Sequence, residues 1–541
     1  MREEWIRRAG LRLRVGFQFF IALAATVLGV GFAVMIYDAV TSRRVVIEAF
    51  HAPPGLTARG IDGAVIASGL LDELSRLQHA TRSSSAALSV SGAWANNIKL
   101  DVPETGVSVG EISRLLRERF GRDVHIDGDL VEALGGGLAL TARGNGVPAK
   151  TFAGTAMELD KLTVKAAEYV YSRSQPARWA QYLVDAGRNT EAVEFCRTAV
   201  AGTDATTRAE LFNDWANALE NTGGSLQEAL LLYREAVKLQ PDLWRSYANL
   251  MNTYMLLGQE EEAWKAGDSM RIAAGGRSGR VPELNYLNMD LLTWNLQAWL
   301  DATQADAAAS AGVGTQVASA GQIIADVQMR MHDPDAAILA LKTTKEDASD
   351  PTIAAMTHFV SGRLATDAGD AASGATEFEA FARAFNDPAV SSNYPGYPCW
   401  IAPSEEAAGH TDKADAVLNT AGTYVDCYRF RADILDGRGD WIAAQKAYAD
   451  AVALAPDLPA AYYSWGVALA RHGDLAGAVA KLQDANQRGP HWADPLKAWG
   501  DVLTKQSQRK GALAKYDEAL KYAPNWAALK EARDAAAKHA S

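Results

Sequence analysis

The first pattern along the chain is one long, uninterrupted apolar stretch. Between Val15 and Tyr37 the only strongly polar side chain is Gln18. A helix of this length can cross the roughly 30 Å hydrocarbon layer of a membrane. The stretch is longer than the core of a usual signal peptide, and no small-residue cleavage site follows it promptly. We therefore favour a single transmembrane helix over residues 15–37, with a cleaved signal peptide as the alternative.

The next segment, residues 44–172, mixes the periods of strands and helices. Its apolar positions predict strands at 44–50, 98–102, 123–128 and 138–143, and helices at 63–78, 108–120 and 157–171. Pro53, Pro54 and Gly55 should end the first strand, and three glycines at 135–137 should turn the last hairpin. Gly144-Asn145-Gly146 also predicts a turn. We expect a small α/β domain here.

The remaining chain has helical periodicity with a fixed repeat length. Equivalent positions recur every 34 residues in four columns: Pro456, Pro490 and Pro524; Ala444, Ala478 and Ala512; Ala451, Ala485 and Ala519; and Gly439, Gly473 and Ser507. Trp465-Gly466 and Trp499-Gly500 occupy a paired large-small position. This pattern resembles the tetratricopeptide repeat (TPR) family, in which each repeat is a hairpin of two helices.

Each column has a physical reason within such a hairpin. The alanines stand where helices cross closely, the glycine permits a left-handed turn, and the proline ends the second helix. A single hairpin cannot bury its apolar face, so several must stack into an α-solenoid. The fold class that we predict is therefore mainly α: one transmembrane helix, a small α/β domain, and a solenoid of TPR-like hairpins.

The register is not equally regular along the array. Residues 173–280 predict TPR-like repeats, with a degenerate first hairpin at 177–201 and two further units at 212–241 and 247–263. Residues 281–424 predict degenerate repeats, interrupted by a proline-rich loop at 386–403. Residues 425–541 predict regular repeats, closed by a capping helix at 526–539.

The α/β segment is also similar to a known module. Its stretches Gly63–Leu77, Phe120–Leu130 and Leu138–Arg143 resemble the amino-terminal domain of TolB-like and FlgO-like envelope proteins. The resemblance lies mostly in packing and turn positions. It implies a non-catalytic module of the cell envelope and supplies no active-site residue.

Positive charges flanking the apolar helix predict its orientation. Arg2, Arg7, Arg8, Arg12 and Arg14 precede the helix, whereas the nearest following cations are Arg43 and Arg44. Positive flanks favour the cytoplasmic side. We expect a cytoplasmic tail at 1–14, single-pass insertion in the cell inner membrane, and soluble domains in the periplasm or another extracytoplasmic space.

Small residues recur along one side of the same helix. Ala25, Gly29 and Ala33 are spaced by four residues, which would allow two copies to approach closely and form a homodimer. Small residues are common in membrane helices, and the alternative that we favour is that these three face lipid.

Charge and cysteine content narrow the choice of partners. The net charge is -12, and an acidic chain repels phosphate, so we expect no nucleic-acid partner. Three cysteines are too few for a disulfide framework. Cys399 and Cys427 could pair in an oxidising compartment, but we favour unpaired, buried thiols.

The sequence offers no catalytic constellation. The nine histidines are scattered, and there is no H-E-x-x-H, P-loop, G-x-S-x-G or C-x-x-C motif. Paired acids such as Asp333 and Asp335 stand in turns, where they cap helices. We expect no catalytic residue, cofactor or metal, and therefore no enzyme.

A partner-binding groove is the remaining candidate site. The TPR resemblance implies that selected positions of each first helix line a concave face; here they are Arg429, Asp433, Asp436, Tyr463, Arg471, Lys497, Asp501 and Lys505. Mixed long charges around an aromatic ring suit a peptide or a partner helix. The family's carboxylate clamp needs an asparagine, and its position holds Asp433, Val467 and Asp501. That departure argues against a C-terminal carboxylate as ligand.

Three functions are consistent with these patterns. The first is a membrane-anchored TPR scaffold of a bacterial-type envelope, which binds protein or peptide partners through the concave face. The second is an envelope enzyme with its active site in residues 44–172 and TPR repeats as accessories. The third is a signalling input module, which the short tail at 1–14 disfavours. We favour the scaffold.

Overall fold

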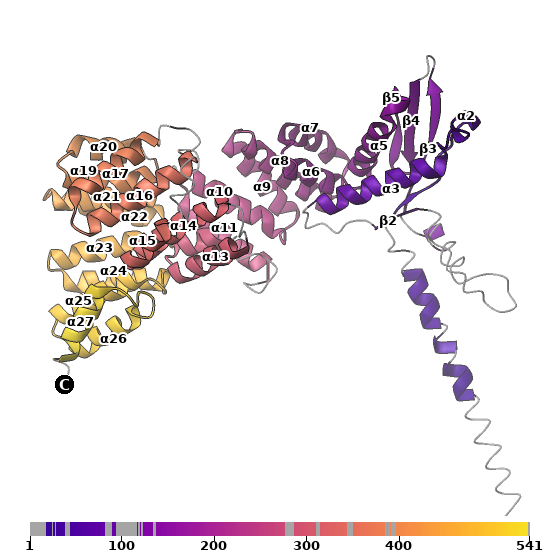
Figure 1. The fold of residues 1–541 in the computed structure, drawn as a ribbon. Coiled ribbons are helices and arrows are strands. Elements are labelled where there is room, and N and C mark those ends of the chain that lie inside the picture. Colours follow the sequence, from indigo (N-terminus) through magenta and orange to yellow (C-terminus); the bar gives the residue numbers. More distant parts are fainter. Residues whose placement is uncertain are drawn as a thin grey trace, which may run out of the picture. The chain divides into compact units, whose positions relative to one another are not determined.

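The computed structural model describes most of the 541-residue chain: residues 18–40 apart from 24, 28, 38 and 39, then 44–81, 89–92, 116, 119–120, 123–133, 137–275, 286–309, 314–342, 350–384, 387, 390, 397–420 and 422–538. The tail at 1–14, the strand expected at 98–102 and most of the helix expected at 108–120 lie outside these residues. The chain divides into two compact units, Met1–Gly224 and Ser225–Ser541 (Figure 1).

The apolar N-terminal stretch is helical. The helix Gln18–Tyr37 is long and apolar enough to cross a membrane, and none of it is buried against the rest of the chain that the structure describes. A signal sequence near an N-terminus has the same properties. The apolar helix is thus confirmed, and its role as a permanent anchor stays a prediction.

A five-stranded sheet forms the centre of the first unit. Its strands are β1 (Arg44–Ile47), β2 (Ser89–Gly92), β3 (Val124–Ala133), β4 (Gly137–Gly144) and β5 (Val147–Thr155), in the order β2-β1-β3-β4-β5. β1 runs parallel to β2 and β3, and β3, β4 and β5 form an antiparallel meander. The expected strands at 44–50, 123–128 and 138–143 correspond to β1, β3 and β4.

Two strands were not expected from the sequence. β5 lies at the sheet edge, where only Val147 is buried, so its residues do not alternate in polarity. Pro148 is tolerated there because an edge strand leaves half of its N–H groups unpaired. β2 occupies the other edge and has only four residues. The Asn145-Gly146 turn between β4 and β5 was expected, and Gly146 has a φ of +81°.

Helices of the first unit share one core with the sheet. They are α2 (Pro54–Thr57), α3 (Gly63–Ala80), η1 (Ala156–Glu158), α5 (Leu159–Ser174), α6 (Pro176–Asp185), α7 (Asn189–Ala199), η2 (Val200–Gly202) and α8 (Ala205–Asn221). Asp62 caps α3 by accepting the Val65 N–H at 2.8 Å. The buried core runs from Ile47 and Leu74 to Trp179 and Leu183, so the α/β domain and the first helices after it form one body.

The second unit is built from helical hairpins (Figure 1). Its elements before the regular repeats are α9 (Leu226–Leu239), α10 (Trp244–Leu256), α11 (Glu260–Ala273), α12 (Leu287–Leu292), α13 (Leu296–Ala309), α14 (Gly314–Arg330), α15 (Pro334–Lys342), α16 (Pro351–Asp367), α17 (Ala371–Ala384), η5 (Tyr397–Ile401), α19 (Ala402–Ala407) and α20 (Thr411–Thr420). Hairpins therefore continue through 281–424, although the sequence register drifts there.

The proline-rich loop expected at 386–403 is partly helical. Tyr397–Ile401 forms η5, and Pro403 lies in the first turn of α19. The expectation of a loop was wrong at this end, because a helix tolerates proline in its first turn, where the backbone N–H has no intrahelical partner.

The regular repeats follow the predicted columns. Their helices are α21 (Val425–Gly437), α22 (Trp441–Leu454), α23 (Ala460–Arg471), α24 (Leu475–Arg488), α25 (Ala493–Lys505) and α26 (Arg509–Ala519), and α27 (Ala527–Lys538) is the expected final helix. Gly439 and Gly473 have φ values of +87° and +83°, and Ser507 adopts the same turn at +61°. A Cβ atom on Gly466 would lie 2.8 Å from Leu482 Cγ, which explains the small residue after Trp465.

Overpacking one alanine column should destabilise the array. Ala478 has no exposed surface, so Ala478→Leu should lower the free energy of unfolding by about 1–3 kcal/mol as neighbouring helices move apart. The matched control is Ala309→Leu, because Ala309 is an exposed helical alanine of the same unit. Urea unfolding followed by circular dichroism measures both. Equal losses in the two variants would show that the column does not mark a close helix crossing.

Candidate functional site

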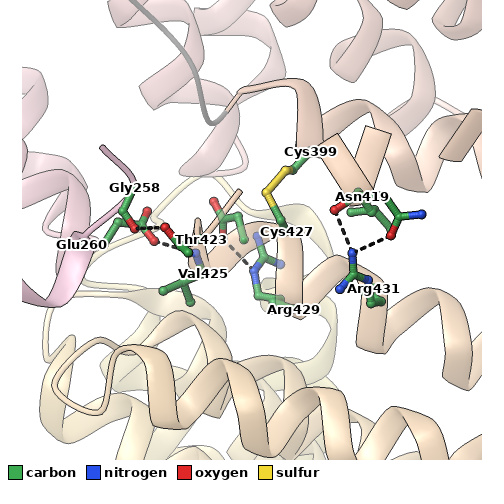
Figure 2. Close-up of a disulfide and its surroundings, with 11 residues drawn as sticks. Gly258, Glu260, Cys399, Asn419, Thr423, Val425, Cys427, Arg429 and Arg431 are labelled. Atoms are coloured by element: carbon green, nitrogen blue, oxygen red, sulfur yellow. Dashed lines mark hydrogen bonds and ion pairs between the residues drawn. A yellow bond between two sulfur atoms is a disulfide. The ribbon is translucent and has the colours of Figure 1, made fainter. Parts of the chain in front are cut away.

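Late hairpins of the second unit contact early ones. The segment that starts α21 lies against the turn between α10 and α11. Thr423 Oγ1 donates to the Gly258 carbonyl at 3.2 Å, and Tyr424 Oη donates to the Leu256 carbonyl at 2.8 Å. The Val425 N–H donates to Glu260 Oε2 at 2.7 Å, as Figure 2 shows. The array is therefore joined to itself across about 165 residues of sequence.

A second set of contacts lies around the turn between α14 and α15. His332 stacks on Trp526 with ring centroids 3.6 Å apart, and its Nε2 lies 3.1 Å from Asp494 Oδ1. Asn525 Nδ2 donates to Asp333 Oδ2 at 2.6 Å. Asp333 was predicted to cap a helix, and its Oδ1 does accept the Ala336 N–H at 3.1 Å. Its second oxygen joins the turn between α14 and α15 to the segment before α27.

The first of these two sets borders a cavity of about 470 Å³ in the second unit, because Leu256, Glu260, Tyr424 and Val425 belong to its lining. Most of its wall is apolar, and the rings of Trp294, Trp299 and Trp400 contribute to it. Trp294 also stacks on Trp492 with ring centroids 4.3 Å apart. A cavity of this size with aromatic walls falls within the range of small-molecule sites.

Three arginines converge on Trp400 beside the cavity. The guanidinium carbons of Arg330, Arg363 and Arg429 lie 4.4, 4.8 and 5.3 Å from its ring centroid. They come from α14, α16 and α21, so one aromatic ring ties three hairpins together through cation–π contacts. Burial and the charge of Arg330 lower the pKa of Arg363 to about 10.

A disulfide fixes the segment that carries this ring. Cys399 of η5 and Cys427 of α21 are bonded, with their Cα atoms 5.0 Å apart and both side chains buried (Figure 2). Our preference for unpaired thiols was wrong for these two, because only the fold brings residues 28 positions apart into bonding distance. It holds for Cys196, which is free and buried, and burial raises the pKa of its thiol.

Glu260 is the titrating group at the contact between α11 and α21. Burial, and then the negative charge of Asp426, raise its pKa from 4.5 to about 8, while the hydrogen bond from Val425 and the charge of Arg429 oppose the shift. The carboxyl group therefore carries a proton at neutral pH and loses it in mildly alkaline solution.

This shift predicts a stability that falls with pH. A raised pKa in the folded state contributes stability that is complete below about pH 4.5 and is lost as pH rises through about 8. From pH 5 to pH 9 we expect the free energy of unfolding to fall by about 2–4 kcal/mol through this group. Glu260→Gln should flatten that slope in urea titrations, whereas Glu262→Gln, at an exposed position of the same helix, should not. An unchanged slope in Glu260→Gln would contradict the assignment.

The predicted groove residues do not all lie on one open face. Arg429 is buried beside Trp400, and Tyr463 packs against Trp492 with ring centroids 4.7 Å apart. Asp433 accepts hydrogen bonds from Tyr448 Oη at 2.5 Å and Ser464 Oγ at 3.4 Å. Burial raises the pKa of both Asp433 and Tyr463. Arg429 is thus buried, and Asp433 and Tyr463 are half-buried and engaged in contacts within the array.

The other five predicted residues are engaged in local contacts, and the side chain of Asp436 is only 6% exposed. Asp436 pairs with Arg471 at 2.6 Å, and Lys497 pairs with Asp501 at 2.9 Å. Lys505 Nζ donates to the Ala470 carbonyl at 3.3 Å. Arg471 and Lys505 are exposed at the ends of α23 and α25. The binding role of all eight residues stays a prediction.

The cavity was not predicted from the sequence. Its polar lining includes Glu260, Gln322, Asp326, Arg330 and Asp426, which share no motif and come from separate stretches of chain. Among the described residues, no group of three or more His, Cys, Asp or Glu side chains could hold a metal ion. The sequence held one weak indication of a buried site here. Trp400 follows Cys399 within the proline-rich segment, and a large aromatic side chain is not expected in an open loop.

Comparison with solved structures shows distant likeness to TPR-repeat proteins. No protein-family model matches the chain, which leaves the resemblance of residues 44–172 to TolB-like domains without further support, and no curated protein matches it either. The Cut9–Hcn1 heterotetramer of the APC/C is 14% identical, with a TM-score of 0.41 over 70% of this chain and 81% of that one. Yeast Tom70 is 12% identical, with a TM-score of 0.33 over 66% of this chain and 93% of that one. YrrB, described as a TPR protein with an unusual peptide-binding site, is 17% identical. Its TM-score is 0.22 over 36% of this chain and 96% of that one.

Proposed function

We propose that this protein is a scaffold of the cell envelope, anchored in the inner membrane by its N-terminal helix, that binds protein partners through its helical repeats. The observation that carries the proposal is the order of parts. An exposed apolar helix precedes a small α/β domain and a long array of TPR-like hairpins. Stacked hairpins offer extended surfaces for other proteins.

Two independent features support an extracytoplasmic location. The arginines before the apolar helix favour a cytoplasmic N-terminus. The bond between Cys399 and Cys427 favours an oxidising compartment, because cytoplasmic thiols are usually kept reduced. The two features agree, since a cytoplasmic N-terminus followed by one membrane span places both cysteines outside.

Reporter fusions test the anchor and its orientation. Alkaline phosphatase, which is active only outside the cytoplasm, should be active when fused after Ser541. An epitope before Met1 should remain on the membrane-bound protein of full length. A soluble product that lacks the epitope would identify the helix as a cleaved signal sequence. An inactive phosphatase fusion would reverse the orientation.

The same helix offers a contact for a second copy. Ala25, Gly29 and Ala33 would form the homodimer face that is the alternative to our favoured lipid-facing arrangement, and a Cβ atom at Gly29 would meet no described atom of this chain within 4 Å. Gly29→Leu should therefore block association between helices without disturbing the fold. A reporter of transmembrane association that responds equally to wild type and Gly29→Leu would rule out this face.

The exposed ends of α23 and α25 are the proposed partner surface. A photo-crosslinking amino acid at Arg471 or Lys505 in the full-length protein should capture one common partner in intact cells, because both side chains are exposed members of the predicted groove set. Gln483 provides the control, since it is exposed on α24 and lies outside that set. Mass spectrometry identifies the products. Equal capture from Gln483, or none from the two test positions, would refute this surface.

A further inference from the structure

Helix α14 directs a row of polar side chains into the cavity of the second unit. Gln322, Asp326 and Arg330 are spaced by four residues, which places them on one helix face, and all three line the cavity. Gln322 and Asp326 are only 3% and 2% exposed. Asp326 Oδ2 accepts from Arg330 Nε at 2.8 Å. This row is therefore part of the interior.

Two acceptors of this row are unoccupied. Gln322 Oε1 and Asp326 Oδ1 are buried and accept no hydrogen bond from the residues that the structure describes. A buried acceptor without a donor costs about 1–3 kcal/mol. Such groups are rare in folded proteins and call for an explanation at each place. Both acceptors belong to cavity-lining residues, so a donor held in the cavity would satisfy them.

The charges of the cavity-lining side chains indicate the charge of the ligand that would supply this donor. Among the ionisable lining side chains, Glu260, Asp326 and Asp426 are acidic and Arg330 is basic. Arg330 is already paired with Asp326, and Asp426 is paired with Arg429 at 2.8 Å. Glu260 faces the same space but carries a proton at neutral pH, so the ionised lining side chains are two acids, Asp326 and Asp426, and one base, Arg330. An excess of acidic groups and open acceptors favours a cation that donates N–H groups.

The rest of the wall sets the shape of the ligand. It is mostly apolar and includes Trp294 and Trp299. Aromatic faces attract cations and pack well against aliphatic rings. The cavity of about 470 Å³ has room for a compact organic molecule.

We propose that this cavity binds a compact, apolar organic cation, such as a primary amine on an aliphatic ring. Its N–H groups donate to Gln322 Oε1 and Asp326 Oδ1, and its apolar body packs against the tryptophan rings. This site is independent of partner binding at the ends of α23 and α25, so failure of one proposal leaves the other standing.

Three probes of matched shape test the charge preference. Cyclohexylmethylammonium, cyclohexylmethanol and cyclohexanecarboxylate differ mainly in the charge and donors of one group. We expect isothermal titration of the full-length protein in nanodiscs, with empty nanodiscs as blank, to show the amine binding at least about tenfold more tightly than the carboxylate. The alcohol should fall between them. Fluorescence of the cavity tryptophans should change on amine binding.

Variants of α14 locate the bound amine. Gln322→Met removes one acceptor with little change in volume and should weaken amine binding by about three- to tenfold, the loss expected for one hydrogen bond. Gln328→Met is the matched control, because Gln328 lies on the same helix and does not line the cavity. Above about pH 8, where Glu260 is ionised, Glu260→Gln should reduce the preference for amine over alcohol. Thermal unfolding confirms that each variant is folded.

Three outcomes would overturn the proposal. If none of the probes binds, the cavity holds only water and the open acceptors are satisfied by it. Tighter binding of the carboxylate would show that the arginines around Trp400, rather than the acids, set the charge preference. Equal weakening by Gln322→Met and Gln328→Met would place the amine elsewhere.

Discussion

Replacing Arg330 with methionine should lower the free energy of unfolding of the second unit by about 3–5 kcal/mol. Arg330 and Asp326 form an ion pair at 2.8 Å, and their side chains are 3% and 4% exposed. Methionine keeps much of the volume but leaves the Asp326 carboxylate buried without its partner. The variant also loses the cation–π contact of Arg330 with Trp400. Urea unfolding followed by tryptophan fluorescence measures the loss.

An exposed pair with the same spacing serves as the control. Arg383 and Glu379 stand four residues apart on α17, with side chains 70% and 51% exposed. Arg383→Met should cost less than about 1 kcal/mol, because exposed ion pairs are screened by water. The double variant Arg330→Met, Asp326→Leu should recover most of the loss, since no buried charge remains unpaired. A small effect of Arg330→Met alone would mean that water reaches this pair.

Removing the disulfide should have an effect of similar size. Cys399→Ala should lower the free energy of unfolding by about 3–4 kcal/mol, because the bond closes a loop of 28 residues in the unfolded chain. Dithiothreitol should lower the stability of the wild-type protein and leave that of Cys399→Ala unchanged. Urea unfolding with and without the reductant separates the two states.

The remaining cysteine provides the comparison for this experiment. Cys196→Ala removes a free, buried thiol from the first unit and should cost only the small loss of packing, about 1 kcal/mol. Its stability should still respond to dithiothreitol. If the wild-type protein is insensitive to the reductant and contains three free thiols, the bond does not form in the native protein.

Features that depend on neighbours along the chain were predictable. The 34-residue columns anticipated the buried Ala478, the left-handed turns at Gly439 and Gly473, and the same turn at Ser507. Each of these positions is determined within one hairpin or between adjacent hairpins, so the pattern carries the information. The apolar helix and three of the five strands were predictable for the same reason, because their periodicity is local.

Features at sheet edges and in irregular segments were not predicted from the sequence. The edge strand β5 has almost no buried side chain, so its sequence lacks the alternation that marks a half-buried strand. Pairing of Cys399 with Cys427 depends on where η5 lies against α21, and η5 follows a stretch with no repeat register. No spacing rule for cysteines predicts such a bond.

The sequence by itself determined the parts and their order: an apolar helix, an α/β domain and a stack of hairpins. The tertiary structure decided which distant residues of the stacked hairpins come together and where the cavity lies. Small rotations between successive hairpins add up, and their sum brings Val425 to Glu260 and Asn525 to Asp333. No local sequence pattern determines the sum of these rotations, since each rotation depends on the packing of whole helices. The cavity and its open acceptors Gln322 and Asp326 follow from this curvature, and for that reason they could not be predicted from the sequence.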